Sequence, residues 1–431
     1  MAVRESNVRS YSRSFPVEIA SAKNARVVSS AGDEYIDFLA GAGALNYGHN
    51  DPVMKAALVD YLMADGITHS LDIATVARNA FLRDFDEVVM QPMALDHRIQ
   101  FTGPTGANAV EAALKLARLV KGRPTIGAFT NSFHGMSLGA LSVTGNSLKR
   151  AGSGVPLTNT VVFPYDGYFG KDVDTIPMIE RLLLDPASGI DLPAAFILET
   201  VQVEGGLNVA SNSWLKRLTE LTSRLGILLI VDDIQTGCGR TGKFFSFASA
   251  GIRPDLVCLS KSISGYGLPM SLLLISPELD VWKPGQHNGT FRGNNLAFVA
   301  GRCAMDRWRD PAFLQGIAAN ASRVREWLVS IRQKYGEDFV QIRGRGMLCG
   351  LKFADVALAE KVSAAAFARH VIVETCGARD DVLKLIPPLT IEPGTLQEGL
   401  DRIASAIAGV CPDVSLDACS SARTDARSSA F

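Results

Sequence analysis

Short apolar runs alternate with helix-period segments through the middle of the chain, from about residue 67 to residue 300. This alternation constrains the fold more than any other feature, because it is typical of a mostly parallel sheet with crossover helices on both faces. The clearest strands are predicted at Ala195–Leu198, Ile227–Val231 and Leu256–Leu259. We therefore expect an α/β fold built around one large sheet.

An ionisable residue stands at or just beyond the carboxyl end of each predicted strand. These residues are Glu199, Asp232 and Lys261. In open α/β sheets, ligands gather at the carboxyl edge of the strands. We therefore expect the three side chains to face one crevice.

The two ends of the chain differ in texture from its middle. Residues 1–66 and 301–410 mix short extended pieces with helical segments, and we expect them to combine into one small α+β domain beside a large domain of residues 67–300. Residues 411–431 are rich in Ser, Ala, Asp and Arg and have almost no large apolar residues. Such a composition is typical of a flexible tail.

Composition excludes several classes of protein. The 43 Lys and Arg residues nearly balance the 44 Asp and Glu residues, and the net charge of −1 argues against a nucleic-acid binder. No apolar run approaches the roughly 18 residues of a membrane helix, and the first residues lack a signal-peptide pattern. Seven cysteines without close-paired spacing and six scattered histidines predict reduced thiols and no metal site. We expect a cytoplasmic globular protein that binds neither nucleic acid nor membrane.

The segment Gly103–Ala107 precedes a run of helical period, so it is expected to form a helix N-terminus. Free backbone N–H groups and the positive end of the helix dipole make such an end suitable for a phosphate. The Gly-Lys-Ser/Thr ending of a Walker loop is missing. A purely structural glycine-rich helix start remains an alternative.

Two adjacent acids, Asp232 and Asp233, follow the second apolar run. They could bind a metal, cap a helix or pair with a cation, but no histidine lies near them in the sequence to complete a metal site. A buried aspartate at a strand end also suits another task. It can keep a cofactor's ring nitrogen protonated, so that the ring withdraws electrons.

Lys261 follows the third predicted strand, within Ser260–Gly267. An ordinary surface lysine is the simpler interpretation, yet a lysine at a buried strand end is costly unless it is paired or covalently used. Desolvation would lower its pKa toward the range in which an amine bonds covalently to an aldehyde. A phosphate site, an acid for a ring nitrogen and this lysine, in that order, together predict a pyridoxal phosphate pocket.

The run Val231–Gly242, with Lys261 placed 261 − 232 = 29 positions after Asp232, resembles the class III, or ω-amino-acid, aminotransferases of fold type I. The resemblance extends over nearly all of residues 5–410. It implies a pyridoxal phosphate enzyme in which Lys261 binds the cofactor and moves the substrate's proton. It also implies that Asp232 pairs with the ring nitrogen and that Gln235 bonds the ring oxygen.

The same resemblance assigns further cofactor contacts. They are Thr105, Gly106 and Ala107 for the phosphate, Phe133 for the ring face and His134 in a supporting role. Thr290 corresponds to a threonine that reaches the phosphate held by the neighbouring subunit in the family. The resemblance therefore implies a homodimer, or a higher homo-oligomer, with shared active sites.

Four segments resemble more narrowly the diaminobutyrate:2-oxoglutarate aminotransferases of this class. They are Phe38–Asn50, Phe101–Asn108, Ser260–Pro269 and His287–Asn295. Those enzymes move the amino group of L-glutamate to L-aspartate 4-semialdehyde, which gives L-2,4-diaminobutyrate and 2-oxoglutarate. Ectoine synthesis is their usual setting, although siderophore and antibiotic pathways also use the diamine. The resemblance implies these substrates and a ping-pong reaction.

One position departs from the pattern of the class. Many relatives have an arginine before the Pro-Pro of a C-terminal strand, where it binds the substrate's α-carboxylate, but this chain has Lys384. Glu204 matches the glutamate that pairs with that arginine, so we expect Glu204 and Lys384 to form an analogous gate. Arg292, where many relatives have glycine, is a second candidate for binding a carboxylate, and a structural role is its alternative.

Two other functions remain open. Another ω-aminotransferase, acting on ornithine, 4-aminobutyrate or a specialised-metabolite aldehyde, would share the same motifs. A catalytically inactive scaffold of the same fold is a more distant alternative. The joint presence of Lys261, Asp232 and Gln235 argues against the scaffold.

Overall fold

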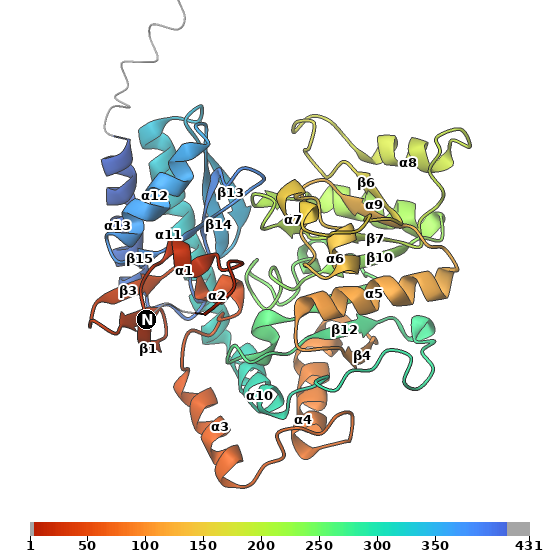
Figure 1. Cartoon of the computed structure of the whole chain (residues 1–431), viewed down its shortest axis with the longest axis horizontal. Helices are drawn as coiled ribbons and strands as arrows, with labels where there is room; N and C mark the ends of the chain where they lie inside the picture. The colour runs from red at the N-terminus through yellow and green to blue at the C-terminus, as the bar shows by residue number, and fades with distance from the viewer. Residues whose placement is uncertain (1–3, 412–431) are drawn as a thin grey trace, which may run out of the picture.

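The computed structural model describes residues 4–411. Two parts lie side by side, a larger part around one seven-stranded sheet and a smaller part with two four-stranded sheets (Figure 1). The predicted flexible tail, residues 411–431, falls outside the described residues apart from Cys411.

The seven-stranded sheet positions the strand ends that the sequence singles out. Its order is β4-β12-β11-β10-β7-β5-β6. The strands are β4 (Arg98–Phe101), β5 (Ile126–Phe129), β6 (Thr160–Phe163), β7 (Ala195–Leu198), β10 (Leu228–Asp232), β11 (Leu256–Leu259) and β12 (Leu272–Ile275). Strand β12 pairs antiparallel with both neighbours, and the other pairs are parallel. The three strands predicted around the crevice are confirmed, with β10 shifted by one residue so that it includes Asp232.

Helices cover both faces of this sheet. In β10, Leu229 belongs to one buried apolar cluster and its neighbour Ile230 to another, because successive side chains of a strand point to opposite faces. Helix α9 (Asn212–Arg224) contributes to the first cluster, and helix α5 (Gly106–Lys121) contributes to the second. The predicted mostly parallel sheet with helices on both faces is confirmed.

The remaining elements of the larger part are shorter or peripheral. Its helices are α3 (Pro52–Met63), α4 (Val76–Phe85), α6 (Leu138–Ser142), α7 (Ser147–Ala151), α8 (Ile176–Leu184) and α10 (Asn295–Arg309), and β8 (Val201–Gln202) pairs with β9 (Asn208–Val209). Helix α10 packs against α3 and α4 and spans residue 300 without a break. The domain boundaries at residues 66, 300 and 410 stay predictions.

The smaller part combines both ends of the chain. One sheet has the order β1-β2-β3-β15, and the other has the order β13-β14-β17-β16. Their strands are β1 (Ile19–Lys23), β2 (Arg26–Ser29), β3 (Glu34–Asp37), β13 (Val340–Arg345), β14 (Leu348–Phe353), β15 (Val371–Ile372), β16 (Glu374–Cys376) and β17 (Val382–Leu385). Strand β15 runs parallel to β3, with Val371 opposite Ile36. The helices are α1 (Tyr11–Ser14), α2 (Ala40–Gly43), α11 (Pro311–Tyr335), α12 (Ala357–Phe367) and α13 (Pro393–Val410).

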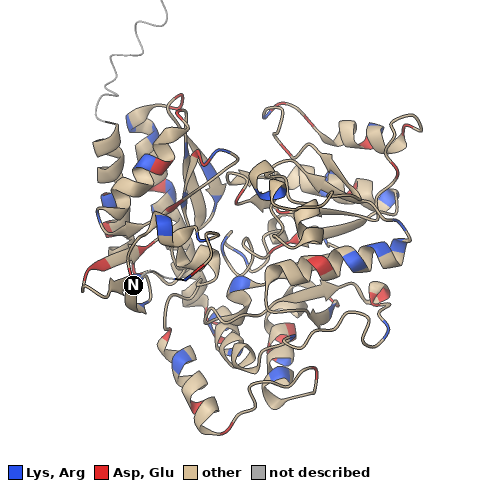
Figure 2. Ribbon diagram, in the orientation of Figure 1, with Lys and Arg blue, Asp and Glu red and all other residues tan. Residues whose placement is uncertain are grey.

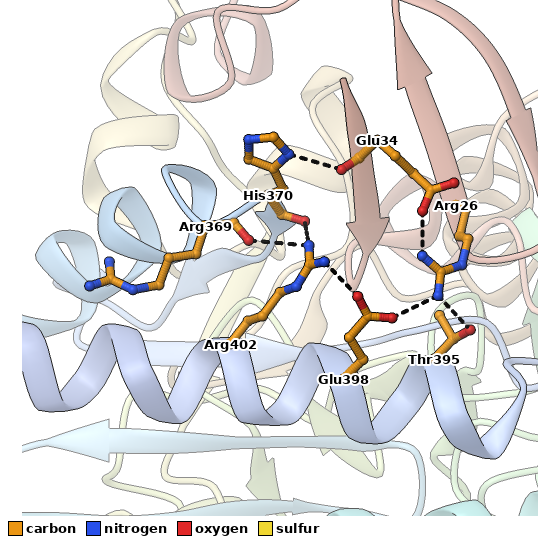
Figure 3. A network of polar contacts seen from close by, with 7 residues as sticks. All are labelled: Arg26, Glu34, Arg369, His370, Thr395, Glu398 and Arg402. Atoms are coloured by element: carbon orange, nitrogen blue, oxygen red, sulfur yellow. Dashed lines mark hydrogen bonds and ion pairs between the residues drawn. The ribbon is translucent and has the colours of Figure 1, made fainter. Parts of the chain in front are cut away.

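A polar network also ties the two ends of the chain together (Figure 3). Arg26 of β2 forms ion pairs with Glu34 and with Glu398 of α13, the latter at 2.7 Å. Arg402 pairs with the same Glu398 and donates to the backbone carbonyl of His370 at 3.3 Å. Because these groups come from β2, β3, α13 and the turn before β15, the network fixes the N-terminal strands on the C-terminal helix.

Charged residues are interspersed by sign over both parts of the molecule (Figure 2). This distribution agrees with the nearly balanced charge of the sequence. Within residues 4–411, no helix combines the length and the apolar character that crossing a membrane requires.

Candidate active site

The carboxyl ends of β7, β10 and β11 meet at one cavity of about 190 Å³. Glu199, Asp232 and Lys261 all line it, as the strand-end positions predict. Of the residues predicted to contact the cofactor, those that also line it are Gly106, Ala107, Phe133, His134 and Gln235. The fold therefore brings together residues that are far apart in the chain. Gly106 and Lys261, for example, are separated by 261 − 106 = 155 positions.

Lys261 carries an amine with a lowered pKa. Burial is the main cause, and the pKa falls from 10.5 to about 8 although the negative charge of Glu204 acts to raise it. The amine Nζ donates a hydrogen bond to the backbone carbonyl of Ala42 at 2.9 Å. A substantial fraction of the amine is therefore neutral near pH 8, which is the form that attacks a carbonyl or takes up a proton.

Ala42, within the short α2 segment, contacts two site residues at once. Its carbonyl accepts from Gln235 Nε2 as well as from Lys261 Nζ, both at 2.9 Å. The backbone of Ala42 lies in the left-handed region, with φ of 54°. Residues other than glycine adopt this conformation mainly where the surrounding structure enforces it. The Ala42 carbonyl thus holds the amine of Lys261 and the amide of Gln235 close to each other at the cavity.

Asp232 is held by a buried histidine. Its Oδ2 lies 2.8 Å from Nδ1 of His134, and its Oδ1 accepts from the backbone N–H of Ile234 at 3.2 Å. Among the described residues, Nε2 of His134 has no hydrogen-bond partner although it is buried. His134 and the Ile234 N–H therefore fix the orientation of the Asp232 carboxylate. A carboxylate held in this way at the cavity is suited to keep a bound ring nitrogen protonated.

Asp233 has a different task from its neighbour. It accepts from Thr236 Oγ1 at 2.6 Å and from the backbone N–H of Ser246 at 3.0 Å, and burial raises its pKa to about 6. Those bonds anchor the loop that follows β10. Of the roles open to the two adjacent acids, the structure gives Asp233 a local structural one.

The N-terminus of α5 forms one wall of the cavity. Thr105 is the N-cap residue, and it forms a capping box with Asn108. A Cβ added to Gly106 would lie 2.8 Å from Cδ1 of Ile234, so a larger residue at this helix end would force the Ile234 side chain to move. The free N–H groups at such an end bind anionic groups.

These observations fit pyridoxal phosphate. The helix end suits its phosphate, Asp232 suits its ring nitrogen, and the Lys261 amine suits its aldehyde. The orphaned His134 nitrogen adds an unsatisfied buried polar atom at the same wall. Thr105 does not line the cavity itself, and its contact with the phosphate stays a prediction.

Glu199 has a role that the sequence did not assign. Its carboxylate accepts from the backbone N–H groups of Phe133 at 2.9 Å and Val203 at 3.3 Å. Burial, followed by the charge of Asp232, raises the pKa of Glu199 well above its usual value. Glu199 therefore fixes the backbone of Phe133. The one indication of a role for Glu199 in the sequence is its position at the end of a predicted strand.

The predicted partners Glu204 and Lys384 lie in direct contact. Nζ of Lys384 lies 2.7 Å from Oε1 of Glu204 and 2.9 Å from Oε1 of Glu374, and the Lys384 side chain is fully buried. Burial disfavours both charges, but the attraction between the two charged groups is stronger than this effect. It lowers the pKa of Glu204 to about 2 and raises the pKa of Lys384 well above its usual value. Glu374 was not anticipated, because it lies on a neighbouring strand and has no motif of its own.

Arg292 and Thr290 lie away from these contacts. Arg292 forms an ion pair with Asp72 at 2.9 Å and lines a separate cavity of about 340 Å³. Thr290 is exposed and lines neither cavity. The ion pair favours the structural alternative for Arg292 within one chain. A carboxylate role for Arg292 and a partner-subunit contact for Thr290 stay predictions.

A mostly parallel sheet with a lysine, an aspartate and a helix N-terminus at its carboxyl edge defines a pyridoxal phosphate enzyme of fold type I. The chain belongs to the class III aminotransferases, whose sequence model matches residues 8–407. It is accordingly an aminotransferase, and its cofactor is pyridoxal phosphate.

Relatives share most of the chain. It is 53% identical to the diaminobutyrate--2-oxoglutarate transaminase of Halalkalibacterium halodurans over 403 residues, which cover 94% of both chains. It is 55% identical to the enzyme of the same name from Bordetella parapertussis over 406 residues, which cover 94% of this chain and 93% of the other.

Solved structures share the fold. The ornithine aminotransferase of Toxoplasma gondii matches with a TM-score of 0.80 and 30% identity, covering 92% of each chain. Another structure of that enzyme, at 29% identity and a TM-score of 0.79, has pyridoxal phosphate partly occupying the active site, with 92% of each chain covered. An ω-transaminase from Thermomicrobium roseum matches with a TM-score of 0.82, covering 95% of this chain and 97% of the other, at 23% identity.

Proposed function

We propose that this aminotransferase moves the amino group of L-glutamate to the aldehyde of L-aspartate 4-semialdehyde. The products are 2-oxoglutarate and L-2,4-diaminobutyrate. The observation that carries the proposal is identity above 50% over 94% of the chain to several enzymes named diaminobutyrate--2-oxoglutarate transaminase. The paired Glu204 and Lys384 support it, because both substrates carry charged groups beyond the reacting carbon.

The side chains at the cavity can perform the proton transfers. Pyridoxal phosphate, when bound, receives the amino group and withdraws electrons from the reacting carbon. The neutral amine of Lys261 takes the proton from that carbon and returns it in the opposite half-reaction. Asp232, oriented by His134, keeps the ring nitrogen protonated. Phe133, fixed through Glu199, excludes water from one ring face.

A half-reaction assay tests the substrate. We expect glutamate and diaminobutyrate each to convert the pyridoxal form of the holoenzyme into the pyridoxamine form, followed by absorbance. Ornithine, which has one more methylene than diaminobutyrate, should react about tenfold or more slowly, the usual cost of one methylene in a fitted pocket.

Other outcomes identify the alternatives. Conversion by ornithine or 4-aminobutyrate without conversion by diaminobutyrate would replace the proposed substrate with that of another ω-aminotransferase. A colourless protein that borohydride leaves unchanged would point to the inactive scaffold.

The gate between Glu204 and Lys384 is part of the proposal. Lys384→Ala should raise the Michaelis constants for glutamate and 2-oxoglutarate by about tenfold, because a charged partner for a carboxylate is lost. Steady-state kinetics measure the change, and Lys384→Arg, which keeps the charge, is the matched control. Unchanged Michaelis constants in a folded Lys384→Ala protein would rule out the gate.

A homodimer with shared sites and a cytoplasmic location complete the proposal. The exposed Thr290 is free to meet a partner subunit, as the family resemblance implies. The odd number of cysteines favours a reducing compartment. Ectoine synthesis stays one of several pathways that would use the product.

A further inference from the structure

A second cavity, of about 150 Å³, adjoins the cofactor cavity, because Phe133 lines both. Two charged side chains line this second cavity, Lys149 and Glu204. The Glu204 side chain is 25% exposed there, although it is paired with Lys384. A substrate whose reacting carbon lies beside Lys261 would extend past Phe133 toward these two charges.

The ammonium group of Lys149 lies against the Phe133 ring and forms no ion pair within the described residues. Its Nζ lies 4.6 Å from the centroid of the Phe133 ring, within the range of a cation–π interaction. The backbone N–H of Lys149 donates to Oδ1 of Asn146, the N-cap residue of α7, at 3.1 Å. Across residues 4–411, no carboxylate lies within ion-pair distance of this ammonium. Lys149 therefore presents a positive charge to the cavity.

Lys384 cannot supply that charge as it stands. It is fully buried, and two carboxylates at 2.7 and 2.9 Å already surround its ammonium. In this arrangement both glutamates already contact the ammonium group of Lys384, so it can bind a substrate carboxylate only after Glu204 has moved away, as the gate requires. Lys149 carries a separate positive charge, which contributes to the lowered pKa of Glu204 and opposes the rise that burial causes in the pKa of Asp380.

The two proposed amino donors share one geometric feature. In glutamate, three carbon–carbon bonds separate the reacting carbon from the side-chain carboxylate carbon. In diaminobutyrate reacting through its γ-amine, three carbon–carbon bonds separate the reacting carbon from the α-carboxylate carbon. One cation at a fixed distance from Lys261 can therefore bind the distal carboxylate of either substrate.

We propose that Lys149 is the residue that selects substrates with this distal carboxylate, by pairing with it in the cavity beside Phe133. The α-ammonium group of diaminobutyrate then lies toward Glu204. The diaminobutyrate half of this assignment rests on the proposed function, whereas the glutamate half requires only an aminotransferase that accepts glutamate.

The test compares substrates with and without the carboxylate in the holoenzyme of Lys149→Met. Norvaline replaces the distal carboxylate of glutamate with a methyl group, and 1,3-diaminopropane is diaminobutyrate without its carboxylate. We expect Lys149→Met to lower kcat/KM for glutamate and diaminobutyrate by about 10- to 100-fold, the worth of one hydrogen-bonded ion. The loss should appear mainly in KM, and the rates with norvaline and 1,3-diaminopropane should not fall.

Three further variants fix the interpretation. Lys149→Arg should retain the preference for carboxylates. Lys149→Gln, which replaces the methionine variant if that protein does not fold, should lose the preference. Lys216→Met, at an exposed position on α9, should behave as wild type. Equal losses with all four amines, or no loss with glutamate, would overturn the assignment. If wild type does not accept diaminobutyrate, the proposed function fails, but the comparison of glutamate with norvaline still decides the role of Lys149.

Discussion

Replacing Lys261 with alanine should abolish amino transfer, lowering kcat by at least about 10³-fold in both half-reactions. The lysine supplies the only amine that lines the cofactor cavity within the described residues, and burial lowers its pKa to about 8 so that it can act as a base. No other group lining the cavity combines a basic amine with this position. Single-turnover absorbance changes with glutamate measure the loss.

A matched control separates chemistry from folding. Lys243→Ala removes an exposed lysine from the loop after β10 and should leave kcat unchanged. Borohydride should fix the cofactor covalently in wild type and in the control but not in Lys261→Ala. A Lys261→Ala protein that keeps activity within about tenfold of wild type would assign the proton transfer to another residue.

Replacing Asp232 with asparagine should have the second-largest effect. Asparagine keeps the shape of the side chain and its contact with the Ile234 N–H, but it loses the negative charge that holds a proton on the ring nitrogen. We expect kcat to fall by about 10² to 10⁴-fold, with little change in thermal stability. Steady-state kinetics and thermal denaturation measure the two quantities.

The neighbouring acid provides the control for Asp232. Asp233→Asn should instead destabilise the fold by about 1 to 3 kcal/mol, because it weakens the buried bonds to Thr236 and Ser246. Its kcat should fall much less than that of Asp232→Asn. If the two variants lost activity to the same extent, the carboxylate of Asp232 would have no special role at the ring nitrogen.

The opposite roles of Asp232 and Asp233 show where sequence reasoning stops. Both follow the same apolar run, and although the strand end points to Asp232 as a crevice residue, nothing in the sequence around them shows that Asp233 anchors a loop. In the structure, the alternation of side chains at the end of β10 sends one carboxylate into the cavity and the other toward Thr236 and Ser246. The predicted strand end placed Asp232 at the crevice, and the family resemblance then assigned it to the ring nitrogen.

The contacts around the amine show the same limit. Ala42, which accepts from Lys261 and Gln235, comes from the N-terminal part of the chain and offers only a backbone carbonyl. Glu374 and Lys149 have no motif and become relevant only through what they lie beside. Contacts between residues far apart in sequence depend on packing, so local spacing does not reveal them.

The sequence by itself determined the large, mostly parallel sheet, the strand ends that carry Glu199, Asp232 and Lys261, and the helix N-terminus at Gly106, because local periodicity and glycine placement act over a few residues. Only the tertiary structure decided which charges meet. It surrounded Lys384 with Glu204 and Glu374 and left Lys149 facing the adjoining cavity. The physical reason is that the energy of a buried charge depends on the few ångströms separating it from its partners, and that distance is set when the two parts of the chain pack together.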